Sequence, residues 1–414
     1  MRSSSRKPLS PEAQALLNAM PSRRGLLRGV AAGGALAVTG GALAACGTKG
    51  KSPTAASSSA AKVCATPDVS AQERKLIFSN WVEYMDTDEK NPSKHPTLDA
   101  FKAKTGIDVT YREDINDNDE FLGKIRNQLG ECKAIEPDLV VFTDWMAAKF
   151  IKLGYAAKFE PTKVVNFQKN LAPSLKGRAF DPEMVYAAPW QSGFTGIGYN
   201  AKVVKTPVKT IDELLTRADL KGKVTVMTEL NDTMGLILLS LGKDPGNFTS
   251  GDYDAAIDKL KKAVDSGQIR RVAGNDYLQD LAKGDSAACI GWSGDVIATG
   301  ADDENVKYVI PEEGQMYWSD NMLIPITSSH ASNAMALIDY YYDPKIAAEL
   351  AAWVNYICPV AGAQAAMKDI DDELVEDSFI FPTETELKKA HAFMPLAEDV
   401  RKDYERKFRA VIGA

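Results

Sequence analysis

Short and long apolar runs alternate along this chain from residue 75 onward, and no other feature constrains its fold as much. The short runs, such as residues 139–142, are rich in β-branched and aromatic side chains and predict buried strands. The longer stretches between them, such as residues 121–129, predict helices. Strands that alternate with helices form parallel sheets covered by helices, so the sequence predicts an α/β protein.

The alternation occurs in two series, followed by a C-terminal quarter that is mostly helical. Because no internal repeat is visible, two α/β lobes between which the chain crosses more than once are the simplest architecture. The predicted strands are 75–79, 107–111, 139–142, 196–199, 223–227 and 287–292, and the predicted helices are 96–104, 121–129, 146–153, 211–215, 234–241, 253–264, 332–342, 344–356 and 386–412.

The first 46 residues carry the features of an export signal. Residues 22–28 resemble a twin-arginine signal, and the weakly apolar run 29–42 leads to Leu-Ala-Ala-Cys, which resembles a lipobox ending at Cys46. A membrane-spanning helix is the alternative, but the run is shorter than the roughly 20 apolar residues that a span needs. We therefore predict export and attachment of lipid to Cys46, which would leave the protein on the outer face of the cytoplasmic membrane.

A linker rich in Ser, Ala, Lys and Thr follows the cysteine, over residues 47–71. It has no apolar periodicity, so we expect a flexible tether. The roughly 340 residues after it are enough for two domains with cores of their own.

The charge of the chain argues against nucleic acid as a partner. The formal net charge is −7; residues 1–45 hold six basic residues and one acidic residue, so 43 basic and 55 acidic residues remain after them, a net charge of −12. Nucleic acid requires a basic face, whereas an acidic protein mildly favours cationic ligands.

Cysteines and histidines give no sign of a metal site. Four cysteines remain after Cys46, and in an oxidising compartment they could form up to two disulfides in three pairings or stay as buried thiols. Their spacing fits no zinc motif, the histidines lie far apart in sequence, and no catalytic constellation or cofactor motif is present. The cysteines are Cys64, Cys132, Cys289 and Cys358, and the histidines are His95, His330 and His391.

A tryptophan recurs close to a carboxylate at four places near strand ends, the last of them a short loop beyond the apolar run 308–310. Open α/β sheets bind ligands beyond the carboxyl ends of their strands. Aromatic rings accept methylene groups and attract cations, and carboxylates bind ammonium groups, so the pattern suits an alkyl ammonium. The alternative is that the tryptophans are core residues and the acids are solvated. The pairs are Trp81 with Glu83, Trp145 with Asp144, Trp292 with Asp295, and Trp318 with Asp320.

The body of the chain resembles the polyamine (spermidine/putrescine) substrate-binding proteins of ABC importers, from about residue 75 to the C-terminus. The phrases that carry the resemblance are short but spread over most of the body. They are Asn-Trp-Val-Glu-Tyr at 80–84, Phe-Lys-Ala-Lys-Thr-Gly-Ile at 101–107, Pro-Asp-Leu-Val at 137–140, Pro-Trp-Gln-Ser-Gly-Phe-Thr-Gly-Ile-Gly-Tyr-Asn at 189–200 and Tyr-Trp-Ser-Asp at 317–320.

The resemblance implies a two-lobed periplasmic-binding-protein fold of type II, with the ligand in a cleft between lobes that are joined by a hinge. Lobe 1 is then expected over 72–192 and 321–358, and lobe 2 over 193–320 and 359–414, with hinge strands near 192–195 and just after Asp320. It also implies a monomer without enzymatic activity or cofactor that delivers a polyamine to ABC permease subunits.

Ten residues match contact positions of that family. Val82 replaces a family Ser or Thr, and Asp232 falls where a Glu is usual, so the choice between putrescine and spermidine stays open. Another small ligand, such as a sugar or a quaternary amine, and a secreted carboxylate-dependent hydrolase are the alternatives. The ten residues are Trp81, Glu83, Tyr84, Trp145, Asp232, Trp292, Asp295, Trp318, Asp320 and Tyr356.

Overall fold

The computed structural model describes residues 64, 66–88 and 90–413, and these residues belong to one compact unit. The predicted export signal, the lipidation of Cys46 and most of the predicted linker lie outside the described residues. Within the described part, no helix combines the length and the apolar character that a membrane span requires.

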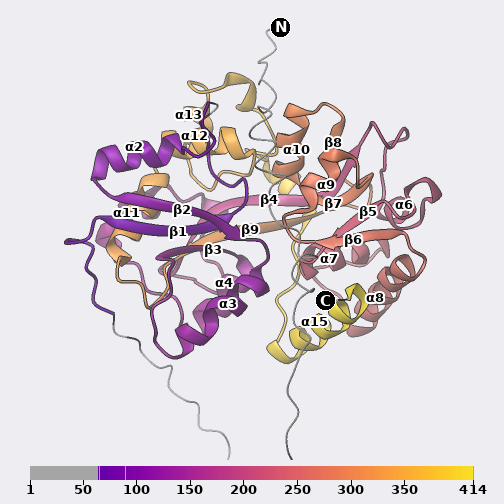
Figure 1. Cartoon of the computed structure of the whole chain (residues 1–414), viewed down its shortest axis with the longest axis horizontal. Coiled ribbons are helices and arrows are strands. Elements are labelled where there is room, and N and C mark those ends of the chain that lie inside the picture. The colour runs from indigo at the N-terminus through magenta and orange to yellow at the C-terminus, as the bar shows by residue number, and fades with distance from the viewer. Residues whose placement is uncertain (1–63, 65, 89, 414) are drawn as a thin grey trace, which may run out of the picture. The chain divides into compact units, whose positions relative to one another are not determined.

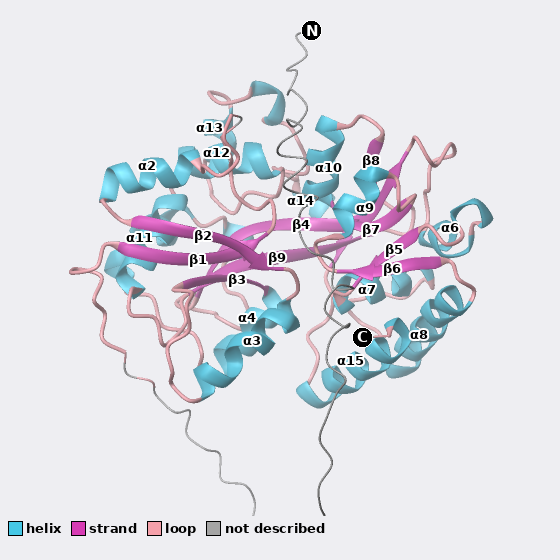
Figure 2. Cartoon of the chain, in the orientation of Figure 1, coloured by secondary structure: helices cyan, strands magenta, loops and turns pink. Residues whose placement is uncertain are grey.

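A single mixed sheet runs through the body, with its path in the order β2-β1-β3-β9-β4-β7-β5-β6 (Figure 1). Helices cover both faces of this sheet (Figure 2), which confirms the predicted α/β architecture. We call the part around β2, β1 and β3 lobe 1, and the part around β7, β5 and β6 lobe 2.

Lobe 1 is built on three parallel strands, because β1 pairs in parallel with both β2 and β3. Each strand is followed by a helix, and α2 illustrates the local signals: Pro96 begins it and Gly106 ends it at φ 73°. The elements are β1 (Lys75–Trp81), α2 (Pro96–Thr105), β2 (Asp108–Ile115), α3 (Asn118–Gly130), β3 (Leu139–Thr143) and α4 (Asp144–Lys152), with the short α5 (Val165–Asn170) after them.

Lobe 2 repeats this arrangement with β5 between β6 and β7, both in parallel. Its longest helix, α8, begins with a capping box in which Thr249 and Asp252 bond each other's backbone N–H groups. The elements are α6 (Ile211–Thr216), β5 (Val224–Met227), α7 (Leu230–Ser240), α8 (Ser250–Asp265), β6 (Ile269–Ala273), α9 (Tyr277–Lys283), β7 (Ala288–Trp292) and α10 (Ser293–Asp302).

Two strands belong to both lobes. β4 (Ala187–Asn200) and β9 (Gln315–Leu323) pair with each other in antiparallel fashion. β9 also pairs with β3 of lobe 1, and β4 also pairs with β7 of lobe 2. Two shorter strands attach to this pair, β8 (Val306–Val309) to β4 and β10 (Ala390–His391) to β9.

The C-terminal quarter is helical, as predicted, but its last part differs. The predicted helix 386–412 is confirmed over 398–412 and wrong before that, because the chain is non-helical from Lys388 to Ala397 and Pro395 has no backbone N–H for a helix interior. The helices are α11 (Ala331–Tyr341), α12 (Pro344–Val354), α13 (Ala363–Met367), α14 (Glu384–Leu387) and α15 (Glu398–Ile412).

One disulfide joins Cys64 to Cys132, just beyond the end of α3, and Cys289 and Cys358 are buried free thiols. The last residues of the predicted linker contact the body: the N–H of Val69 donates to the carbonyl of Ser329 (2.8 Å). One of the arrangements left open by the sequence, a single bridge with two buried thiols, is therefore the one observed.

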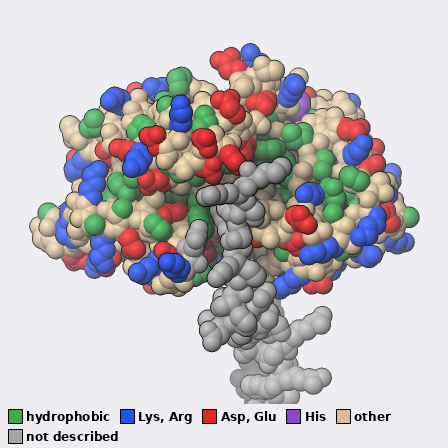
Figure 3. All heavy atoms as spheres, turned by 90° about the horizontal axis from the view of Figure 1, so that it is seen from above, with side chains coloured by type: hydrophobic (Ala, Val, Ile, Leu, Met, Phe, Trp, Pro, Cys, Tyr) green, Lys and Arg blue, Asp and Glu red, His purple; other side chains and the backbone are tan. Residues whose placement is uncertain are grey.

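Charged side chains of both signs are interspersed on the face shown in Figure 3, with apolar side chains among them. That visible face carries no continuous basic surface.

Candidate functional site

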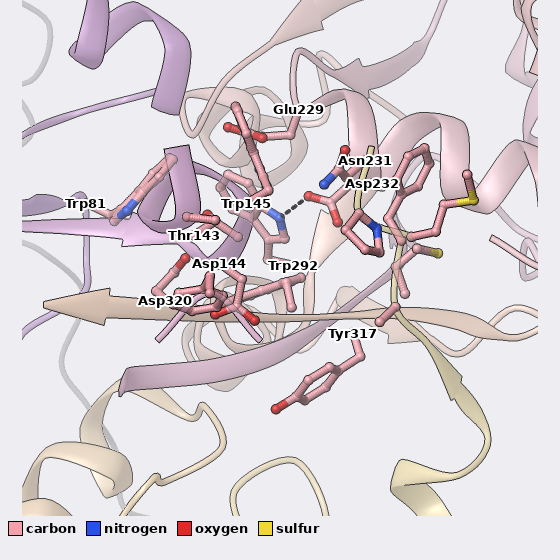
Figure 4. A pocket seen from close by; sticks show the side chains of 18 of the residues that line it. Trp81, Thr143, Asp144, Trp145, Glu229, Asn231, Asp232, Trp292, Tyr317 and Asp320 are labelled. Carbon is pink, nitrogen blue, oxygen red and sulfur yellow. Dashed lines mark hydrogen bonds between the residues drawn. The ribbon is translucent and has the colours of Figure 1, made fainter. Parts of the chain in front are cut away.

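A cavity of about 500 Å³ lies where the carboxyl ends of β1, β3, β5 and β7 face the crossing strand β9. This is the place where open α/β sheets bind their ligands. Figure 4 shows side chains from both lobes pointing into it. Nine of the ten predicted site residues line it: Trp81, Tyr84, Trp145, Asp232, Trp292, Asp295, Trp318, Asp320 and Tyr356.

Glu83 is the tenth, and the structure does not place it in the lining. The chain turns sharply after β1, and Glu83 has a φ of 57°, in the left-handed region that few non-glycine residues adopt. Its side chain is exposed, and its backbone N–H donates to Oε1 of Glu113 at 3.1 Å. The neighbours Trp81 and Tyr84 face the cavity instead.

The register of β9 places Asp320 at the cavity, opposite Thr143 of β3. The hydroxyl of Tyr84 donates to its Oδ2 at 3.1 Å, whereas its Oδ1 is buried and has no hydrogen-bond partner in the described part of the chain. Burial raises the pKa of Asp320 to about 7. No strand predicted from the sequence includes Asp320, but the residue belongs to β9.

Asp295 lies in the first turn of α10, directly after β7. The hydroxyl of Tyr356 donates to its Oδ1 at 2.5 Å and that of Tyr277 to its Oδ2 at 3.3 Å, and its own N–H donates to the Tyr356 oxygen at 3.2 Å. Burial raises the pKa of Asp295 to about 7. Within the described part of the chain, the groups that bond Asp295 are therefore all neutral.

Asp232 is held by a chain of bonds that runs through two tryptophans. Thr195 donates to its Oδ1 (2.8 Å) and the indole N–H of Trp292 to its Oδ2 (3.1 Å), which Figure 4 marks. The indole N–H of Trp318 in turn donates to the hydroxyl of Thr195 at 3.0 Å. Burial raises the pKa of Asp232 to about 6. The two rings and the acid are thus fixed relative to one another.

The aromatic rings of the cavity meet edge to face. The centroid distances are 5.8 Å for Trp81 with Trp292, 5.2 Å for Tyr84 with Tyr356, and 5.3 Å for Trp318 with Tyr356. Such contacts are a favoured geometry of aromatic pairs, so the rings hold one another in place.

Gly193 of β4 makes this packing possible. A Cβ at that position would lie 2.6 Å from Cζ2 of Trp318 and 2.8 Å from Cδ1 of Tyr356. Any larger residue there would push both rings out of place. The glycine in the sequence phrase 189–200 is therefore required by the close approach of two site residues.

Two arginines that no sequence pattern indicated also line the cavity. Arg178, before β4, pairs with the carboxylate of Asp144, which also accepts a bond from Asn321 at 2.8 Å. Arg401 reaches the cavity from α15, close to the irregular segment 392–396. Their positions depend on how distant parts of the chain pack, so spacing along the sequence cannot reveal them.

Chemically, the cavity is built to hold a positive charge. Among the described residues, no basic side chain forms an ion pair with Asp232, Asp295 or Asp320. Unpaired buried carboxylates are costly, so a ligand cation would lower the free energy of this site. The part of the chain that the structure describes holds no group of three or more side chains suited to a metal ion.

Comparisons with known proteins agree with this geometry. Residues 97–378 match the model of the family described as bacterial extracellular solute-binding protein. The chain is 25% identical over 337 residues to the spermidine/putrescine-binding periplasmic protein of Escherichia coli K12, which covers 81% of this chain and 91% of that protein.

Two further proteins are similar. The chain is 28% identical over 334 residues to the putrescine-binding periplasmic protein PotF of the same organism, covering 76% of this chain and 85% of PotF. The solved structure of the Tp0655 lipoprotein of Treponema pallidum superposes with a TM-score of 0.67 at 21% identity, over 82% of this chain and all of the other. These matches confirm the predicted resemblance and the two-lobed fold.

Proposed function

The chain belongs to the bacterial extracellular solute-binding protein family, and we propose that its solute is a polyamine, putrescine or spermidine. The names of the relatives in Escherichia coli support this ligand class, at 25% and 28% identity. The family binds solutes rather than transforming them, so the protein is a binding protein and not an enzyme.

One observation carries the proposal: three buried acids without a basic partner among the described residues stand between aromatic rings. Asp232, Asp295 and Asp320 are 8%, 4% and 5% exposed, so water neutralises little of their charge. Ammonium groups would form charge-assisted hydrogen bonds with them, and the alkyl chain would lie against the tryptophan rings.

We propose that lobe closure accompanies binding. The proposed lobes are 72–192 with 321–358 and 193–320 with 359–414, and β4 and β9 join them near Ser192–Thr195 and just after Asp320. Closure around the ligand would exclude water and shift the population toward the state that permease subunits of an ABC importer accept. The protein would act as a monomer in this cycle.

The location we propose is the outer face of the cytoplasmic membrane. Export through the twin-arginine signal and lipid on Cys46 would leave the body tethered there. The Cys64–Cys132 disulfide supports an oxidising compartment outside the cytoplasm.

The other ligands considered from the sequence have less support. A sugar would use the tryptophan rings but would not neutralise three buried acids, and a quaternary amine cannot donate hydrogen bonds to them. A carboxylate-dependent hydrolase does not fit the membership in a family of solute-binding proteins.

Calorimetric titration of the purified protein with putrescine and spermidine tests the proposal, with glucose and choline as controls. We expect a Kd of about 1 μM or lower for at least one polyamine and no heat with the controls. If neither polyamine binds, or if a control binds more tightly, the ligand class is wrong while the fold and family stand.

A further inference from the structure

The two lobes also touch away from the strands that join them. The chain after β2 of lobe 1, residues 116–118, lies against the segments after β5 and β6 of lobe 2, residues 228–229 and 274–275. These segments follow the carboxyl ends of parallel strands, and Glu229 and Asn275 also line the cavity. The contact between the lobes is therefore next to the proposed ligand site.

Asn118, the first residue of α3, forms the buried centre of this contact. Its N–H and its side-chain amide both donate to Oε1 of Glu229, at 3.3 and 2.9 Å. Asn118 is 0% exposed and Glu229 is 6% exposed, so water competes little for these bonds. Separating the lobes would break both bonds and return each polar group to water.

The side chain of Asn118 also reaches a residue beside one of the unpaired acids. Its Nδ2 donates to the hydroxyl of Thr143 at 3.0 Å, and its Oδ1 accepts from the N–H of Thr143 at 3.2 Å. Thr143 ends β3 and lies opposite Asp320 of β9, and Figure 4 shows Thr143, Asp320 and Glu229 around the same cavity. Asn118 therefore connects the strand end beside Asp320 with an acid of the opposite lobe.

Two further hydrogen bonds cross between the lobes on either side of this asparagine. The hydroxyl of Thr228 donates to Oδ2 of Asp117 at 2.9 Å. The N–H of Asn275 donates to the carbonyl of Asn116 at 3.3 Å. Neither Thr228 nor Asp117 is among the residues that line the cavity, so their bond can be changed without touching a ligand.

Gly274 shows how closely the lobes approach each other. A Cβ at this position would lie 2.5 Å from both the carbonyl oxygen and the side-chain nitrogen of Asn116. The three heavy atoms nearest to such a Cβ all belong to Asn116, and the backbone of Gly274 is outside the left-handed region. A larger residue is therefore opposed by the approach of lobe 1 and not by the backbone conformation of lobe 2.

We propose that residues 116–118, 228–229 and 274–275 form a latch that holds the lobes together and slows the release of a bound polyamine. This inference rests on the proposed polyamine function and on the lobe closure proposed with it. When the lobes open, the four hydrogen bonds of the latch are exchanged for bonds to water. When a ligand fixes Asp320, it also fixes the strand end that Asn118 holds, so binding and latching favour each other.

Gly274→Ala gives the sharpest test, because the added methyl group meets Asn116 only when the lobes close. We expect the Kd of the polyamine that binds the wild-type protein more tightly to rise by about tenfold or more in calorimetric titration. The matched control is Gly123→Ala, since a Cβ at Gly123 would have no heavy atom within 4 Å. This control should bind as the wild-type protein does.

Stopped-flow fluorescence shows which rate changes, because four tryptophans line the cavity. In Gly274→Ala we expect dissociation to be about tenfold faster and the association rate constant to stay within about twofold of wild type. A latch acts after the ligand has entered, so it affects release and not capture.

Thr228→Val is the second variant, and it tests the latch even if Gly274→Ala does not fold. It keeps the shape of the side chain and removes the hydroxyl that donates to Asp117, so the dissociation rate should rise about threefold. The matched control is Thr216→Val, because the hydroxyl of Thr216 donates to the carbonyl of Asp212 within lobe 2 at 2.7 Å.

The melting temperature of the ligand-free variants separates a latch from a contact that only supports the fold. Because the latch forms when the lobes close, we expect melting temperatures within about 2 °C of wild type. A lower melting temperature together with an unchanged dissociation rate would overturn the inference.

Wild-type dissociation rates in both folded variants would also overturn the latch while leaving the polyamine function intact. The same conclusion would follow if the two control variants changed the dissociation rate as much as the latch variants. A wild-type protein that binds neither putrescine nor spermidine would overturn the proposed function, and this inference with it.

Discussion

Asp144, the first residue of α4, and Asp320 of β9 line the same cavity, yet only one of the two carboxylates is paired with a basic side chain among the described residues. Asp144 pairs with Arg178 and accepts a bond from Asn321. Asp320 receives one bond, from the neutral hydroxyl of Tyr84, and its second oxygen has no partner in the described structure. Burial raises the pKa of both, but ion pairing with Arg178 works against this only for Asp144.

The difference separates a structural acid from an acid kept for a ligand. A buried pair that the protein completes by itself contributes to folding and has no need of another cation. A buried carboxylate left without a cation costs stability until a ligand arrives. Five predictions test this comparison.

The largest effect is expected for Asp144→Asn. Arg178, only 11% exposed, would lose its charge partner, so the free energy of unfolding should fall by about 2 kcal/mol. Urea denaturation followed by circular dichroism measures it. A stability equal to wild type would show that Arg178 finds another partner and that Asp144 is no structural acid.

Asp320→Asn should weaken ligand binding without lowering the stability of the protein. It removes a buried charge without a partner, so the ligand-free protein should be as stable as wild type or more so. Polyamine affinity should fall by about tenfold or more, roughly 1.4 kcal/mol, in calorimetric titration. Loss of stability together with unchanged affinity would place Asp320 in the same class as Asp144.

Trp292→Phe probes the bond that holds Asp232 in place. The variant keeps an aromatic ring and loses the indole N–H that donates to Asp232, so affinity should fall by about fivefold. Trp81→Phe is the matched control, because the indole N–H of Trp81 is buried without a partner in the described part of the chain. Equal losses in the two variants would show that ring area matters and the bond does not.

The smallest effect is the pH dependence of binding. Asp295 and Asp320 have pKa values of about 7, while the ammonium groups of a polyamine stay charged below pH 8. Between pH 7.5 and 6.5 the ionised fraction of such an acid falls about threefold, so affinity should fall about threefold for each acid that binds the ligand.

The stability of the ligand-free protein should move in the opposite direction. Between about pH 4 and pH 7, an acid whose pKa is raised by folding holds a proton in the folded state but not in the unfolded state. The free energy of unfolding therefore falls as the pH rises across this range, and the contribution is lost above about pH 7. Thermal melts at pH 5.5 and 8 check this. A constant melting temperature, with affinity also constant, would mean that these acids are not strained in the free protein.

The sequence predicted the alternation of strands and helices because each strand is a short apolar run. It failed for β9, where polar residues such as Gln315, Ser319 and Asn321 are buried between two neighbouring strands and no apolar run is visible. The helical prediction over 386–397 neglected Pro395, which lacks the backbone N–H that a helix interior requires.

The candidate site was predictable where a residue lies at a strand end. Trp292 and Asp295 follow that rule, because β7 ends at Trp292 and α10 begins next to it. Glu83 is an exception, because it follows β1 with a left-handed backbone at φ 57° and does not line the cavity. Arg401 could not be found, because only the packing of α15 against α8 brings it there, with Tyr253 and Tyr404 stacked 3.7 Å apart.

The disulfide between Cys64 and Cys132 has a mechanical consequence. A pull on the chain before Cys64 passes through a covalent bond directly to the loop after α3, as well as along the backbone toward β1. If residues 66–70 were detached from Ser329, the force would therefore still not act on β1 alone. Force applied at this end is shared between two points of lobe 1, and the strands that join the lobes lie outside its path.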